Sequence, residues 1–117
     1  MAATGSSSPA PIPDLKAAAV AQLAPLVAIG CRSGDTVLGL SGVRRTRGLA
    51  YVLVDPRLAP GTQRELAQLQ GRGTRVFRVE DLGPVRQACG RPDVLVIGVK
   101  AGNLADGLAA RLVAAST

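Results

Sequence analysis

Two short and almost entirely apolar runs constrain the fold of this chain most strongly. Residues 49–55 read LAYVLVD and residues 93–99 read DVLVIGV. A strand that alternates between apolar and polar residues has one face in water, whereas a strand without alternation has both faces covered. Each run therefore predicts a strand in the interior of a sheet that carries helices on both sides.

Helix and strand signals alternate along the rest of the chain. We expect helices over 15–31, from Ser41 to Gly48, over 62–69, 81–89 and 103–115, and strands over 36–39, 49–55, 74–79 and 93–99. Asp14, Thr62 and Asp81 are expected to cap the helices that follow them. This order predicts an α/β chain folded as a three-layer α/β/α sandwich with a four-stranded, mostly parallel central sheet, and a mixed sheet fits the same pattern.

The domain organisation follows from composition. Residues 1–13 are rich in Ser and Pro and have too little apolar surface to offset the entropy of ordering, so we expect a disordered tail. Residues 14–117 have the length and apolar content of a single domain.

The chain is basic, with 14 Lys and Arg against 8 Asp and Glu and a formal charge of +6. A positive balance favours polyanionic partners, among which nucleic acid is the commonest class. The alternative is a general Arg bias of the chain with no specific partner.

The residues that usually perform catalysis are missing or explained otherwise. The sequence contains no histidine, no phosphate-binding loop with its Gly-Lys-Ser/Thr ending, and no Gly-x-Gly-x-x-Gly after a strand. The carboxylates lie mostly at expected caps and turns. We therefore expect no enzyme activity and no cofactor.

The two cysteines, Cys31 and Cys89, are too far apart in sequence to indicate a metal site, and none is expected. The N-terminus lacks the features of a secretory signal, and no apolar run approaches the roughly 18 residues that cross a membrane. A cytoplasmic protein with two reduced, buried thiols is the simplest interpretation, and a single long-range disulfide is the alternative.

A cluster of arginines follows a glycine-containing turn. Gly39-Leu40-Ser41-Gly42 precedes Arg44, Arg45 and Arg47. Free backbone N–H groups at a helix start, together with nearby arginines, can hold phosphates, although a solvated helix face is the alternative. Because Tyr51 and Phe77 are the only aromatic residues, binding by base stacking is disfavoured, and a shaped RNA fits better.

Three stretches in order resemble a known family: LVAIGCRSGDTVLGLSGVRRTRGLAYVLVDPRLAP, RVFRVEDLGPVRQACGRPDVLVIGV and KAGNLADGL. Over residues 15–115 the chain is similar to the L-seven-Ae/L-thirty-e superfamily of ribosomal and kink-turn RNA-binding proteins. That resemblance implies an RNA surface made of two parts. One is the start of the second helix, at a Gly-x-Asn-Glu motif followed by a Lys, and the other is the loop between the fourth helix and the last strand.

Carried onto this chain, the motif's glycine falls near Gly39 and its basic residue on Arg44, while the second loop falls on residues 90–94. Leu40 and Ser41 stand where the family has the Asn and Glu that read bases. We therefore expect relaxed or altered specificity, since each polar base contact is worth about 1–3 kcal/mol of discrimination in the DNA case. The expected RNA-binding residues are Gly39, Leu40, Ser41, Gly42, Arg44, Arg45, Arg47, Arg91, Pro92, Val94 and Lys100.

The resemblance implies a non-catalytic ribosomal-type or ribosome-associated protein that binds structured RNA, ribosomal or kink-turn-like. Its further partners would be ribosomal or RNA-modifying proteins. One alternative is a protein-interaction module on the same fold that has lost kink-turn recognition. Another is a relic of a substrate-recognition domain from an RNA-modifying enzyme. The electrostatic surface discriminates between the first two: RNA binding requires Arg44, Arg45, Arg91 and Lys100 on one continuous surface, and the protein-interaction module gains if these residues scatter over several faces.

Overall fold

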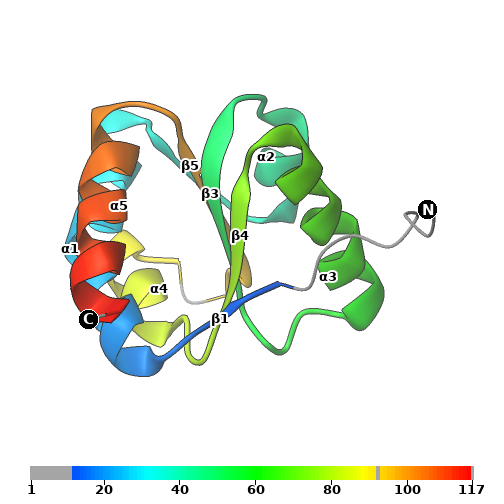
Figure 1. Ribbon diagram of the computed structural model, residues 1–117, viewed down its shortest axis with the longest axis horizontal. Coiled ribbons are helices and arrows are strands. Elements are labelled where there is room, and N and C mark those ends of the chain that lie inside the picture. Colours follow the sequence, from blue (N-terminus) through cyan, green and yellow to red (C-terminus); the bar gives the residue numbers. More distant parts are fainter. Residues whose placement is uncertain (1–11, 92, 117) are drawn as a thin grey trace.

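The computed structural model describes residues 12–91 and 93–116, and it places a mixed sheet between two layers of helices (Figure 1). The strands are β1 (Asp14–Leu15), β2 (Thr36–Leu38), β3 (Leu49–Val54), β4 (Arg75–Val79) and β5 (Val96–Lys100). The helices are α1 (Ala17–Ser33), α2 (Leu40–Arg45), α3 (Pro60–Ala67), the 3-10 helix η1 (Gln68–Arg72), α4 (Gly83–Cys89) and α5 (Asn103–Ser116). Helices α1, α4 and α5 cover one face of the sheet, while α2 and α3 cover the other. The predicted α/β/α sandwich is confirmed.

The sheet has five strands in the order β1-β4-β3-β5-β2. Strand β4 runs parallel to both β1 and β3, whereas β5 runs antiparallel to both β3 and β2. The four predicted strands are all present, and β1 is an addition of only two residues at the edge. Such a short strand has no alternation that a sequence pattern could reveal.

The apolar runs are explained by the two helix layers. On β3, Tyr51 and Leu53 pack toward α1, α4 and α5, while Val52 and Val54 pack toward α2 and α3. Both sets are buried, and the two aromatic rings of the chain, Tyr51 and Phe77, lie 6.3 Å apart within the first cluster. Because neither face of β3 meets water, alternation is absent from its sequence.

The expected caps serve other purposes. Asp14 lies in β1, where its carboxylate forms a 2.8 Å ion pair with Arg78. The residue that precedes α1 is Lys16. Helix α3 begins at Pro60, so Thr62 lies inside it. The carboxylate of Asp81 accepts a hydrogen bond from the backbone N–H of Gly83, but Leu82 is the residue that precedes α4. In α3 and α4, a proline in the first turn fixes the helical φ angle and starts the helix without a side-chain cap.

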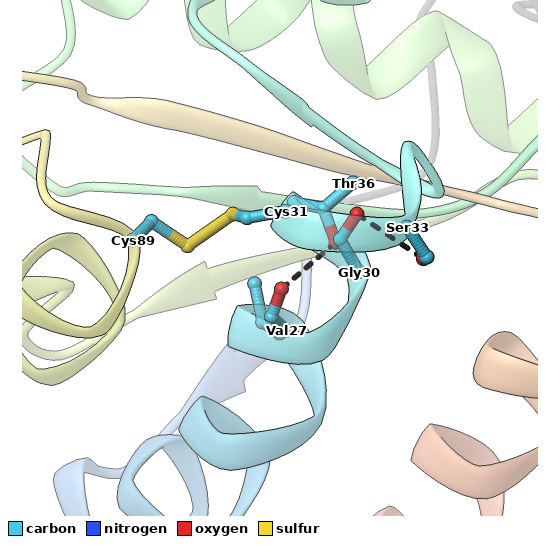
Figure 2. Close-up of a disulfide and its surroundings, with 6 residues drawn as sticks. All are labelled: Val27, Gly30, Cys31, Ser33, Thr36 and Cys89. Carbon is cyan, nitrogen blue, oxygen red and sulfur yellow. Dashed lines mark hydrogen bonds between the residues drawn. A yellow bond between two sulfur atoms is a disulfide. The ribbon is translucent and has the colours of Figure 1, made fainter.

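A disulfide joins Cys31 to Cys89, across a sequence separation of 58 residues, with the two Cα atoms 6.2 Å apart (Figure 2). It links the last turns of α1 and α4, which pack side by side on the sheet. The expectation of two reduced, buried thiols is therefore wrong, and the alternative, a single long-range disulfide, is confirmed. Both residues are only partly buried. The pairing depends on how two helices dock, which their local sequences do not encode.

Helix α1 approaches β2 closely because Gly30 lacks a side chain. The hydroxyl of Thr36 donates a 3.0 Å hydrogen bond to the carbonyl of Val27, in the space beside Gly30 (Figure 2). A methyl group on Gly30 would overlap that hydroxyl and would come within 2.5 Å of Leu104 on α5. The glycine thus lets three elements meet at one point.

Within the described ranges, no helix has the length and apolar character needed to cross a membrane. Ile12 and Pro13, from the end of the predicted tail, contact the fold. Ile12 packs against the apolar cluster on the α2 and α3 side, and the Pro13 carbonyl accepts a hydrogen bond from the N–H of Arg78. The remainder of the predicted tail, residues 1–11, lies outside the described residues.

Candidate nucleic-acid interface

The start of α2 and the loop before β5 meet at one end of the sheet. The backbone N–H of Gly39 donates a 2.9 Å hydrogen bond to the carbonyl of Val96. The pairing of β2 with β5, in which Leu38 lies opposite Ile97, sets this contact. Residues 39–42 (the 39–42 segment) therefore approach residues 90, 91 and 93–95, the described part of the connection from α4 to β5 (the 90–95 loop). The family resemblance assigns to RNA the start of α2, in the 39–42 segment, and residues 90–94 of this loop.

Glycines shape the 39–42 segment. Gly39 has a φ of 88°, which lets the chain turn directly from β2 into α2 without strain. At Gly42 a Cβ atom would lie 2.6 Å from a methyl of Val37, so the missing side chain brings α2 close to β2. Leu40 is half-buried against the apolar cluster, and Ser41 is exposed. The first N–H groups of any helix have no partner within it, so this segment offers donors beside an exposed hydroxyl.

The 90–95 loop begins where α4 ends. Gly90 has a φ of 70°, and the N–H of Arg91 donates to the carbonyl of Arg86 at 3.0 Å. Arg91 is exposed and lies 4.0 Å from the carboxylate of Asp93, whose side chain is also exposed. Val94 is buried in the core, so it can offer a ligand only its backbone. The predicted contact Pro92 lies outside the described residues.

A buried carboxylate, Asp55, supports this end of the sheet. Its backbone N–H donates to the carbonyl of Leu95 at 2.9 Å, which ties β3 to the 90–95 loop. Its side chain is 3% exposed and accepts hydrogen bonds from Arg57, at 3.0 Å, and from Arg86 on α4, at 3.2 Å. Asp55 thereby joins three elements, β3, α4 and the loop.

The ionisation of Asp55 is set by opposing effects. Burial disfavours the charged form, but the hydrogen bonds from the Arg57 side chain and backbone, together with the positive charges of Arg57 and Arg86, outweigh it. The pKa of Asp55 is therefore lowered, and the carboxylate is charged at neutral pH. From the sequence, Asp55 is only the last residue of an expected strand. The signal that could have singled it out is that an acid at the end of a buried strand needs cationic partners.

The three clustered arginines do not act alike. Helix α2 ends at Arg45, so Arg47 lies in the connection to β3, and the predicted extension of this helix to Gly48 is wrong. Arg44 donates two hydrogen bonds to Glu65 on α3, at 2.8 and 2.7 Å. The hydrogen bond raises the pKa of Arg44 and lowers the pKa of Glu65. Arg44 thus has a protein carboxylate as its partner.

Lys100 lies at the opposite end of β5 from Val96. Its backbone N–H donates to the carbonyl of Asp35, and the N–H of the next residue, Ala101, donates to the carbonyl of Gly48. Lys100 is therefore near the far end of the α2 connection and away from the 39–42 segment. The structure brings the 39–42 segment to the 90–95 loop but does not bring Lys100 to either.

Neither a family model nor a curated protein matches this chain. Its fold is nevertheless found in solved structures. A Bacillus halodurans protein of unknown function superposes with a TM-score of 0.62 at 21% identity, covering 79% of this chain and 97% of its own. A Giardia lamblia 15.5 kD RNA-binding protein superposes with a TM-score of 0.64 at 18% identity, covering 88% of this chain and 91% of its own. At such identities the likeness establishes a shared fold.

Proposed function

We propose that this protein binds structured RNA, without catalysis, through the surface formed by the 39–42 segment and the 90–95 loop. The observation that carries the proposal is the hydrogen bond from Gly39 to Val96, the first residue of β5. It holds the 39–42 segment beside the end of the loop whose residues 90–94 the family resemblance assigns to RNA. The fold shared with the RNA-binding protein of Giardia lamblia supports it further. Ribosomal or kink-turn-like RNA is the class we propose as ligand.

The chemistry of this surface suits a folded backbone better than unstacked bases. The N–H groups of the first helical turn and the hydroxyl of Ser41 can bond to phosphate and sugar oxygens, and Arg91 supplies an exposed positive charge. Both aromatic rings are buried, so they are not free to stack on bases. We therefore propose that RNA shape and backbone, more than sequence, determine binding.

Charge reversal in the 90–95 loop tests the proposal. We would compare Arg91→Glu with Arg32→Glu, an equal change at an exposed residue in the last turn of α1. Binding of a kink-turn RNA and of a straight duplex of equal length would be followed by fluorescence anisotropy at several salt concentrations. The proposal expects Arg91→Glu to weaken binding at least tenfold more than Arg32→Glu. Equal affinities of the two variants, or no binding by the unaltered protein, would count against it.

A second function, a protein-interaction module, is favoured by one observation. Arg44 is engaged by Glu65 and Lys100 lies away from the 39–42 segment, so the continuous basic surface expected for RNA is interrupted. If the unaltered protein binds no RNA in the titration above, and the same loop variant disrupts a complex recovered from its native host, this alternative replaces the first.

A further inference from the structure

A second basic feature lies on the side of the molecule where α2 and α3 cover the sheet. A groove of about 800 Å³ runs between the end of α2 and its connection to β3 on one side, and α3 and η1 on the other. Four arginines and one acid line it: Arg44, Arg45, Arg47, Arg72 and Glu65. Below we call it the arginine groove.

The arginine groove carries an excess of positive charge. Glu65 neutralises Arg44 through two hydrogen bonds and so fixes α2 to α3 across the groove. Arg45, Arg47 and Arg72 are exposed, and none of them forms an ion pair with any residue that the structure describes. Like charges held near one another on a folded surface repel, and an anionic ligand relieves that repulsion.

The backbone segments that carry Arg47 and Arg72 are held together by a buried hydrogen bond. The side-chain hydroxyl of Thr74, a buried lining residue, donates a 2.7 Å hydrogen bond to the carbonyl of Leu49, which joins the start of β4 to the start of β3. Arg72 ends η1 two residues before Thr74, and Arg47 precedes Leu49 by two. Arg47 and Arg72 therefore line the groove from the two segments of the chain that this hydrogen bond holds together.

We propose that the arginine groove binds a chain of two or more linked phosphate groups. Guanidinium groups present planar pairs of N–H donors that match the oxygens of phosphate, and three unpaired arginines exceed what one phosphate needs. The ligand is either the backbone of an RNA or a free polyphosphate such as a nucleoside triphosphate.

The RNA source rests on the proposed function. Helix α2 has six residues and is therefore about 9 Å long, with the 39–42 segment at its start and the arginine groove at its end. One RNA that contacts the 39–42 segment could thus continue into the groove. Binding of a free polyphosphate does not depend on RNA binding, so experiment can separate the two ligands.

The test uses a double variant in the groove, Arg47→Gln with Arg72→Gln. Its matched control is Arg32→Gln with Arg111→Gln, which removes the same charge from exposed positions on α1 and α5, across the sheet. A conservative variant, Arg47→Lys with Arg72→Lys, keeps the charge. Thermal unfolding of all four proteins would first establish that each is folded.

Two ligands are then titrated into each protein, a structured RNA at several salt concentrations and sodium tripolyphosphate by calorimetry. If the ligand is RNA, the glutamine variant in the groove lowers the salt slope of RNA binding by about 2 and weakens binding at 0.15 M salt by about 30-fold. The control variant binds RNA like the unaltered protein, apart from the small non-specific loss of affinity caused by two fewer positive charges. The lysine variant retains the slope. If a free polyphosphate is the source, tripolyphosphate binding is lost in the groove variant only.

The outcomes separate this inference from the proposed function. Tripolyphosphate binding that needs Arg47 and Arg72, without any RNA binding, would refute the proposed function and support the groove. If RNA binds but the groove and control variants have equal salt slopes, and tripolyphosphate binding is equal too, the inference is overturned while the proposed function stands. Poly-glutamate that binds the groove as tightly as tripolyphosphate would also overturn it, because the groove would then select carboxylates.

Discussion

The disulfide between Cys31 and Cys89 should supply a large part of the stability of this fold. It closes a loop across a sequence separation of 58 residues, which restricts the unfolded chain far more than the folded one. The chain-entropy relation gives about 4 kcal/mol for a loop of this length. For a small domain, whose total stability is about 5–15 kcal/mol, this is a substantial fraction.

The assay is equilibrium unfolding in urea, with and without the reductant TCEP, on the unaltered protein and on the double variant Cys31→Ser with Cys89→Ser. We expect TCEP to lower the free energy of unfolding of the unaltered protein by about 4 kcal/mol. The double variant should match the reduced protein and should not respond to TCEP. Thiol titration of the unfolded, unreduced protein should detect no free cysteine.

Two results would refute this reasoning. The detection of two free thiols in the unreduced protein would mean that the pair does not form a bond. A full release of thiols on reduction with a stability change below about 1 kcal/mol would mean that the cross-link does not restrict the unfolded chain as the entropy argument requires.

Three further predictions concern residues that the sequence alone does not single out. Gly30→Ala should destabilise the protein by about 1–3 kcal/mol in urea unfolding, because the added methyl overlaps its neighbours, whereas Gly71→Ala, where nothing lies within 4 Å, should not; a gain of stability at Gly30 would contradict the packing argument. Asp55→Asn should cost about 3 kcal/mol at neutral pH. Because the folded pKa of Asp55 is lowered, its contribution is complete above the unfolded pKa of about 3.9 and is lost as the pH falls through the folded pKa, so the variant should show a flatter stability profile in that acid range, and an unchanged profile would exclude this role. Glu65→Gln should free Arg44 and steepen the salt dependence of RNA binding by about 1, and an unchanged slope would place Arg44 outside the contact.

The order of helices and strands could be predicted because the burial of a strand by helix layers on both faces is visible in the sequence of that strand alone. The runs 49–55 and 93–99 lack alternation since both faces of β3 and β5 are buried, and that property is local. What could not be predicted depends on contacts between distant segments. The edge strand β1 exists because it pairs with β4, and the disulfide exists because α1 docks on α4.

The candidate interface divides in the same way. The glycines and arginines near α2 are visible as a pattern, and the resemblance assigns residues 90–94 to the same RNA surface. The partners that decide what each charge can do are distant in sequence: Glu65 lies 21 residues from Arg44, and Arg86 lies 31 residues from Asp55. Arg72 belongs to the arginine groove only because η1 lies across that groove from the end of α2. No spacing rule within one segment indicates such pairs.

The proposed RNA interface can be mapped by an amide NMR titration of the full chain with a structured RNA. We expect the backbone N–H signals of residues 39–42 and of the 90–95 loop to shift first and together, because one RNA contacts both segments. Signals that shift only on α1 and α5, across the sheet, or that do not shift at all at moderate salt would contradict this expectation.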